Sequence, residues 1–105
     1  MSEHYATRMV EVRNEQGLHA RPADMFVRHA KQFDARIEII KEGERFDGKS
    51  ILSLMTLAAV QGTKLVLEAT GPDADEALGT LAELFEREFD EERMTEPAKD
   101  SSTDG

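Results

Sequence analysis

Cysteine is absent from this chain of 105 residues, which excludes disulfide bonds, thiolate metal sites and a cysteine nucleophile. No run of about 18 apolar residues occurs, so no membrane-spanning helix is expected. The first residues, Met1 to His4, also lack the apolar segment of a secretory signal. These absences together favour a cytoplasmic protein. The length leaves room for one hydrophobic core and not for two.

Basic residues are outnumbered, with 13 Lys and Arg against 22 Asp and Glu, a net charge of −9. Nucleic-acid binding requires a basic surface, so this excess of acid argues against it. Residues 90–105 carry a net charge of −4, whereas basic residues gather in the first half of the chain. These basic residues are Arg21, Arg28, Lys31 and Lys49. They could attract an acidic partner, or they could be ordinary solvated charges.

Histidine and acidic residues do not occur at metal-ligand spacing, and no glycine-rich nucleotide loop is present. We therefore expect neither a metal ion nor another cofactor.

The spacing of apolar residues predicts the order βαββαβα. Strands are predicted over 7–13, 35–41, 44–47 and 63–70, and helices over about 20–33, 50–59 and 73–89. This order favours an α+β fold, a two-layer open-faced sandwich with the helices on one face of the sheet. Residues 1–6 are expected to be an N-terminal overhang, 7–92 the folded domain, and 93–105 a disordered acidic tail.

Finer predictions concern the ends and faces of the helices. Asp73 and Glu76 have the spacing of a capping box at the start of the last helix, and the Gln61-Gly62 pair is predicted to end the second helix. Leu54, Leu57 and Ala58 form one plausible buried stripe on that second helix. Ile51, Leu52 and Met55 then fall on another face, either as an exposed contact patch or as further core residues.

The segment from Gly17 to Ala23 places a histidine just before the predicted start of the first helix. Proline is tolerated in the first turn of a helix, so Pro22 predicts a helix beginning near Ala20, with His19 at or beside its N-cap. A helix N-terminus is a ready phosphate site. His19 could therefore carry a phosphoryl group on its ring, although a surface histidine serving as a poor cap is the alternative reading. His4 and His29 lack such a setting.

Ser50 is the second candidate site. Serine is a good N-cap residue and a short helix follows it, so a purely structural role would explain it.

The sequence resembles the HPr family, the histidine-containing phosphocarriers of the bacterial phosphoenolpyruvate-dependent phosphotransferase system. Gly17 to Ala23 resembles the motif around the phosphorylated histidine, and Gly48 to Met55 the motif around a regulatory serine. Gln61-Gly62-Thr63 also stands at the family's place. The resemblance extends from about Arg8 to Phe89 without an evident gap.

The resemblance implies a four-stranded antiparallel sheet with three helices on one face. It implies that His19 attacks through Nδ1, that it accepts phosphate from Enzyme I and passes it to an EIIA domain in sugar transport, and that Arg21 pairs with the phosphoryl oxygens. Ser50 would be phosphorylated by an HPr kinase/phosphorylase, and Ile51, Leu52 and Met55 would dock partners. Arg28, Lys31 and Lys49 are further docking candidates. We expect a monomer that is phosphorylated by partner enzymes and is not itself an enzyme.

A second hypothesis comes from another class of protein. The chain could be a regulatory binding module whose Ser50 phosphorylation state governs docking to a transcription factor or kinase. A family paralogue of that kind lacks the phosphorylatable histidine. His19 is present here, so the carrier hypothesis leads.

Overall fold

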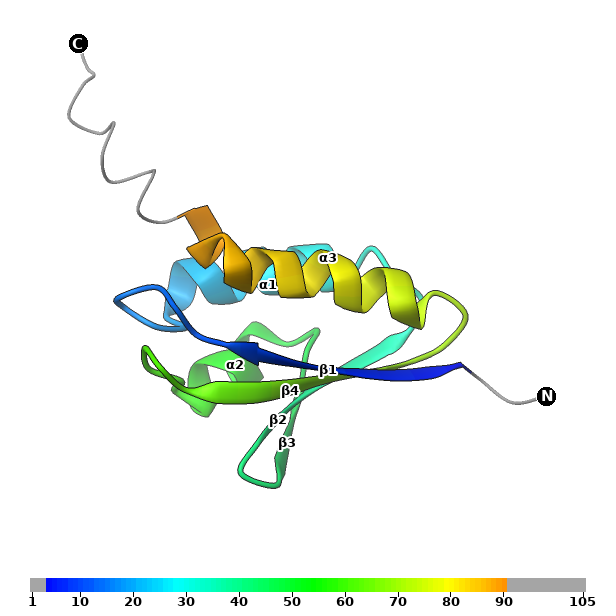
Figure 1. Ribbon diagram of the computed structural model, residues 1–105, viewed down its shortest axis with the longest axis horizontal. Helices are drawn as coiled ribbons and strands as arrows, with labels where there is room; N and C mark the ends of the chain where they lie inside the picture. The colour runs from blue at the N-terminus through cyan, green and yellow to red at the C-terminus, as the bar shows by residue number, and fades with distance from the viewer. Residues whose placement is uncertain (1–3, 91–105) are drawn as a thin grey trace, which may run out of the picture.

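The computed structural model describes residues 4–90, which form one antiparallel sheet covered on one face by helices (Figure 1). The elements in chain order are β1 (Tyr5–Glu11), α1 (Ala20–Ala30), β2 (Arg36–Lys41), β3 (Glu44–Asp47), α2 (Ile51–Leu57), β4 (Lys64–Thr70), α3 (Ala74–Glu86) and a short 3₁₀ turn η1 (Glu88–Asp90). The strand order is β1-β4-β2-β3. This confirms the predicted order of elements and the α+β open-faced sandwich.

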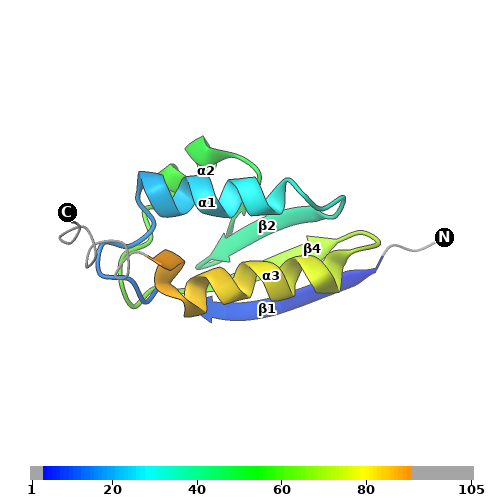
Figure 2. The ribbon, with the colours of Figure 1, turned by 90° about the horizontal axis from the view of Figure 1, so that it is seen from above.

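The hydrophobic core lies between the sheet and the helices. Side chains of a strand alternate between its two faces, so Leu65, Leu67 and Ala69 of β4 point into the core and are buried. Helices α1 and α3 lie side by side above the sheet (Figure 2). The Phe85 ring is the centre of an aromatic cluster, with centroids 6.0 Å from Phe26 and 5.0 Å from Phe89.

The N-terminal strand begins earlier than predicted. It starts at Tyr5 and not at residue 7, and it ends at Glu11 and not at residue 13. The carbonyl of His4 accepts from the N–H of Gly71 at 2.8 Å, and His4 Nε2 lies 2.6 Å from the Asp75 carboxylate. The expectation that residues 4–6 belong to an overhang was therefore wrong, because Tyr5 and Ala6 pair with β4 and His4 bonds to the β4–α3 turn.

The capping box predicted from Asp73 and Glu76 does not form. Asp73 is the N-cap of α3, but its side chain makes no capping hydrogen bond to that helix. Its two carboxylate oxygens instead accept from the backbone N–H groups of Asp34 and Ala35, each at 2.8 Å. The hydrogen bond from the Asp34 N–H, and to a smaller extent that from Ala35, lowers the pKa of Asp73. The residue ties the α1–β2 loop to α3.

Helix α2 is shorter than predicted. It ends at Leu57, and Ala58 takes the left-handed conformation with φ of 53°. This turn exposes Ala58 and buries Ala59, so the prediction of a buried Ala58 was wrong. The left-handed position that commonly ends a helix falls on Ala58 and not near Gly62.

The C-terminal helix also stops early, at Glu86. Glu88, Phe89 and Asp90 all have positive φ, which turns the chain sharply and places the fully buried Phe89 ring against Phe85. The predicted tail, residues 93–105, lies outside the described residues.

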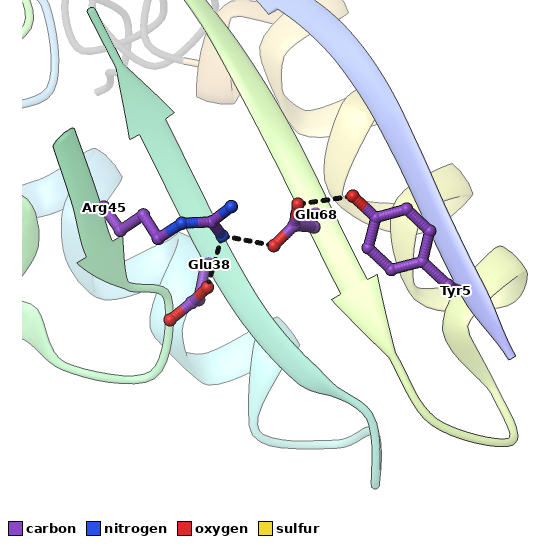
Figure 3. A network of polar contacts seen from close by, with 4 residues as sticks. All are labelled: Tyr5, Glu38, Arg45 and Glu68. Atoms are coloured by element: carbon purple, nitrogen blue, oxygen red, sulfur yellow. Dashed lines mark hydrogen bonds and ion pairs between the residues drawn. The ribbon is translucent and has the colours of Figure 1, made fainter. Parts of the chain in front are cut away.

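A polar network crosses the open face of the sheet (Figure 3). The Arg45 guanidinium on β3 contacts the carboxylates of Glu38 on β2 and Glu68 on β4. Tyr5 on β1 donates its hydroxyl to Glu68 at 2.6 Å. The Glu68 side chain is only 11% exposed. The hydrogen bond from Arg45, and then that from Tyr5, lower the pKa of Glu68.

This network predicts a pH-dependent contribution to stability. Because the folded-state pKa of Glu68 is lowered, its contribution is present above the unfolded pKa of about 4.3. It is lost as the pH falls through the lower folded value. We expect Glu68→Gln to reduce the free energy of unfolding at pH 7 by on the order of 1 kcal/mol, and by less at pH 3, which lies below the unfolded pKa. Urea unfolding at both pH values measures this. Glu83→Gln, at an exposed position of α3, is the control. An equal loss of stability at both pH values for Glu68→Gln would refute the electrostatic account.

Candidate functional site

His19 is the N-cap of α1, with extended backbone angles and no side-chain capping hydrogen bond to the helix. Its carbonyl accepts from the N–H of Ala23 at 3.0 Å. The helix itself offers no acceptor to the N–H groups of Ala20 and Arg21, and Pro22 has no N–H. The helix therefore begins where the sequence predicted, with the half-buried His19 at its positive end.

The loop before His19 is held by a buried side chain that the sequence did not single out. Asn14 is only 1% exposed, and its Nδ2 donates to the Gly17 carbonyl at 2.7 Å. The Gly17 N–H donates back to the Asn14 carbonyl at 3.1 Å, and the Gly17 carbonyl also accepts from the His19 N–H at 3.0 Å. The known tendency of Asn to bond to nearby backbone in turns was the signal that could have identified it.

Gly17 brings this loop against the end of α2. Its φ is +74°, and a Cβ added there would lie 2.4 Å from the carbonyl oxygen of Ala59. The next residue, Leu18, donates its N–H to that same oxygen at 2.9 Å. Only glycine fits both the angle and the approach. The position of His19 therefore depends on the loop that follows α2.

A second contact joins the other ends of the two helices. Lys49, just before α2, donates from Nζ to the carbonyl of Phe33, just after α1, at 2.7 Å. With the Leu18–Ala59 bond at the opposite ends, α1 and α2 run antiparallel. His19 and Ser50 thus lie at opposite ends of the helix pair, and α1, with 11 residues, is about 16 Å long at 1.5 Å per residue.

The basic candidates are distributed along α1 and at the start of α2. Arg21 is exposed in the first turn of α1, and Lys31 is exposed at its C-terminal end. Arg28 pairs with Asp24 one turn earlier, at 3.0 Å. The Lys49 ammonium donates to the Phe33 carbonyl. Lys49 therefore links the two helices, besides being a docking candidate.

The apolar candidates on α2 are exposed, at 41% for Ile51, 77% for Leu52 and 44% for Met55. Leu54 and Leu57 of the same helix are buried. Val60, which the sequence reasoning missed, is 66% exposed and follows the Ala59 residue that holds the His19 loop. We call Ile51, Leu52, Met55 and Val60 the apolar strip.

Ser50 is the N-cap of α2, and its hydroxyl accepts from the Ser53 N–H at 3.1 Å. The side chain is half-buried. The structural role that the sequence allowed for Ser50, that of a helix cap, is therefore present in the structure.

The other candidate chemistries gain no support from the structure. His29 lies inside α1, where its Nδ1 is 2.8 Å from the Met25 carbonyl. Within residues 4–90, no group of three or more His, Asp or Glu side chains could hold a metal ion. In the same part of the chain, none of the helices is long and apolar enough to cross a membrane.

Comparisons with known proteins agree on the family. The family description "PTS HPr component phosphorylation site" matches residues 6–87. Phosphocarrier protein HPr of Treponema pallidum is 41% identical over 83 residues, covering 79% of this chain and 94% of the relative. HPr-like protein Crh of Bacillus subtilis is 44% identical over 79 residues, covering 75% of this chain and 93% of the relative.

Solved structures give the same result. The crystal structure of HPr-C-His from Thermoanaerobacter tengcongensis has a TM-score of 0.78 at 38% identity, covering 80% of this chain and 94% of its own. The fold is the open-faced α+β sandwich of these solved phosphocarrier proteins. The chain belongs to the HPr family of the phosphotransferase system.

The tight approach at Gly17 yields a prediction. We expect Gly17→Ala to destabilise the fold by about 2 kcal/mol or more, because the left-handed angle alone disfavours a side chain by roughly 1–2 kcal/mol. The added Cβ would also displace the Ala59 carbonyl, so hydrogen exchange of the Leu18 amide should quicken more than the global loss requires. Gly79→Ala is the matched control, since Gly79 lies in α3 with open space around it and should gain up to about 1 kcal/mol. Unchanged Leu18 protection would refute the coupling of the two loops.

Proposed function

We propose that this chain is a phosphocarrier that accepts a phosphoryl group on His19 from Enzyme I and passes it to an EIIA domain. The observation that carries the proposal is the placement of His19 as the N-cap of α1, at the positive end of that helix. Membership of the HPr family supports the same role. A cytoplasmic location and a part in sugar uptake belong to this proposal.

The chemistry follows from the start of the helix. A neutral imidazole nitrogen, Nδ1 by resemblance to the family, attacks phosphorus. The new N–P bond forms as the bond to the donor breaks. The N–H groups of Ala20 and Arg21 and the positive helix end favour the added negative charge. Arg21 is always charged and can pair with the phosphoryl oxygens. The partner enzyme supplies the remaining catalysis, so the chain carries the group without turning over a substrate.

Partner docking is proposed on the apolar strip together with the exposed basic residues of α1. Exposed apolar side chains that lie close together are typical of interaction sites. Arg21 and Arg28 of α1 and Lys31 at its C-cap are exposed on the helix that packs against α2. An acidic partner would gain association rate and orientation from them.

The first prediction concerns the acceptor. Incubation with phosphoenolpyruvate and a compatible Enzyme I should place an acid-labile, base-stable phosphoryl group on His19, and His19→Ala should take up none. His29→Ala is the matched control and should be labelled normally, because His29 is bonded within α1. Arg21→Ala should slow the transfer and leave the fold intact. Labelling of the His19→Ala chain would refute the assignment.

The second prediction concerns docking. Met55→Glu should weaken binding to Enzyme I and change stability by no more than about 0.5 kcal/mol, because Met55 is exposed. Met9→Glu, on the open face of the sheet where Met9 is 67% exposed, is the matched control and should bind normally. Titration of each variant with Enzyme I by calorimetry, beside urea unfolding, separates the two effects. Equal binding by both variants would remove the apolar strip from the interface.

Regulation at Ser50 is proposed through the same surface. A phosphate adds about −1.5 to −2 charges near neutral pH. The two sites are at opposite ends of the helix pair, and the Debye length is only about 8 Å at physiological ionic strength. The charge should therefore disturb a partner resting on the apolar strip, rather than repel the phosphoryl group on His19 directly.

This account predicts that phosphorylation of Ser50 by an HPr kinase/phosphorylase slows phosphoryl transfer to His19, mainly by weakening Enzyme I binding. The melting temperature should stay close to that of the unmodified chain, because the phosphate sits at a helix N-terminus. Equal Michaelis constants for phosphorylated and unmodified chains would contradict regulation and leave Ser50 as a helix cap.

A regulatory module is the second candidate, favoured by the 44% identity to HPr-like protein Crh. The His19 experiment separates the two, since a pure regulatory module would not depend on this histidine. We also propose a monomer. Solved relatives include an HPr dimer from Thermoanaerobacter tengcongensis and a Crh dimer with a swapping domain, so sedimentation of the full chain is the deciding measurement.

A further inference from the structure

A surface groove runs between the edge strand β1 and the C-terminal half of α3. Its volume is about 290 Å³, at the lower limit of small-molecule sites, and it is partly open to solvent. Met9 and Val10 of β1 and Ala82 and Phe85 of α3 form its apolar part. A partly open groove beside a strand edge fits an extended chain better than it fits an enclosed small ligand.

Cationic side chains outnumber acidic ones in this groove. Arg8, Arg13 and Lys64 line it together with the carboxylates of Glu11 and Glu86. Arg8 and Glu86 form only a loose ion pair, at 3.9 Å. In a chain with a net charge of −9, three basic residues along one edge are a local reversal of sign.

The groove also borders an unprotected strand edge. β1 pairs with β4 on one side only, because it is the first strand in the order β1-β4-β2-β3. Natural proteins commonly cover such an edge with a loop or helix, since exposed edges invite pairing with other chains. Within residues 4–90, α3 lies above β1 (Figure 2) without pairing to its edge.

The chain leaves the described region close to this groove. Phe85 and Glu86 line the groove, and the left-handed turn at Glu88 to Asp90 follows at once. The buried ring of Phe89 fixes this turn. A neighbouring hollow lined by Arg13 and Glu88 links the turn to the groove.

Fifteen residues follow this turn, five of them acidic and two basic, which gives a net charge of −3. By random-coil statistics, fifteen residues have a root-mean-square end-to-end distance of about 21 Å, enough to run along the groove. Tethering gives the segment an effective concentration on the order of millimolar, well above that of most free competitors. Charge, length and point of attachment therefore point to the same occupant.

We propose that residues 91–105 bind back along the β1–α3 groove, with their acidic side chains facing Arg8, Arg13 and Lys64. The segment would cover the free edge of β1 and leave the apolar strip and His19 open. This proposal is independent of the proposed phosphocarrier function, because no phosphoryl transfer enters it.

The absence of cysteine allows a clean test on the full chain. Ser102→Cys introduces a single thiol that a nitroxide label can occupy, and paramagnetic broadening of backbone amides then reports where the tail lies. We expect loss of peak intensity at Arg8 to Arg13 and at Lys64, restored when ascorbate reduces the label. Raising the salt to 1 M, where the Debye length is about 3 Å, should abolish the localised loss.

Two charge variants sharpen the result. Arg13→Gln combined with Lys64→Gln should remove the broadening, whereas Arg28→Gln combined with Lys31→Gln, an equal change of charge on α1, should leave it intact. Broadening spread evenly over the surface, or centred on the apolar strip, would overturn the proposal. So would broadening that arises only between chains, detected by mixing labelled chains without ¹⁵N with unlabelled ¹⁵N chains, since the occupant would then be the tail of a second copy.

Discussion

The geometry of the site depends on one backbone carbonyl, that of Ala59. It accepts the N–H of Leu18 and lies where a side chain on Gly17 would stand. Through this contact the loop that carries His19 is held by the chain segment that follows α2, more than 40 residues away in the sequence. A hydrogen bond between backbone groups does not depend on side-chain identity. The contact therefore requires glycine at position 17 and the left-handed turn at Ala58.

The rest of the functional surface follows from that contact and its counterpart at the other end. Lys49 reaches the carbonyl of Phe33, so α1 and α2 are joined at both ends and lie antiparallel. This arrangement brings α1, with its exposed basic residues, alongside α2, with its exposed apolar residues. Exposed residues on two neighbouring helices suit contact with another protein more than they suit enclosure of a small ligand. His19 lies at the end of α1 that is joined to the segment after α2.

The fold was largely predictable because apolar periodicity reports which face of an element is buried. The alternation of Leu65, Leu67 and Ala69 marked β4, and the spacing of Phe26, Val27 and Ala30 marked α1. Pro22 marked the start of α1, which fixed His19. The spacing of Asp73 and Glu76 misled, because a carboxylate accepts from any N–H nearby and the tertiary fold brought those of Asp34 and Ala35. The burial of Asn14 was not predicted, because a buried polar residue in a loop does not contribute to the periodic pattern of apolar residues.

The left-handed residues mark the limit of sequence reasoning most clearly. Ala58 and Phe89 have positive φ, a conformation that disfavours an L-residue by roughly 1–2 kcal/mol. Nothing in their local sequence indicates it. In both cases burial of an apolar side chain offsets part of the conformational free energy of the turn. Ala59 enters the core after Ala58, and Phe89 itself packs against Phe85. Full burial of a phenylalanine contributes about 1.5–3 kcal/mol, enough to offset the conformation at its own position. These turns set where α2 ends and where the chain leaves α3. Both points are therefore determined by long-range packing and not by local propensity.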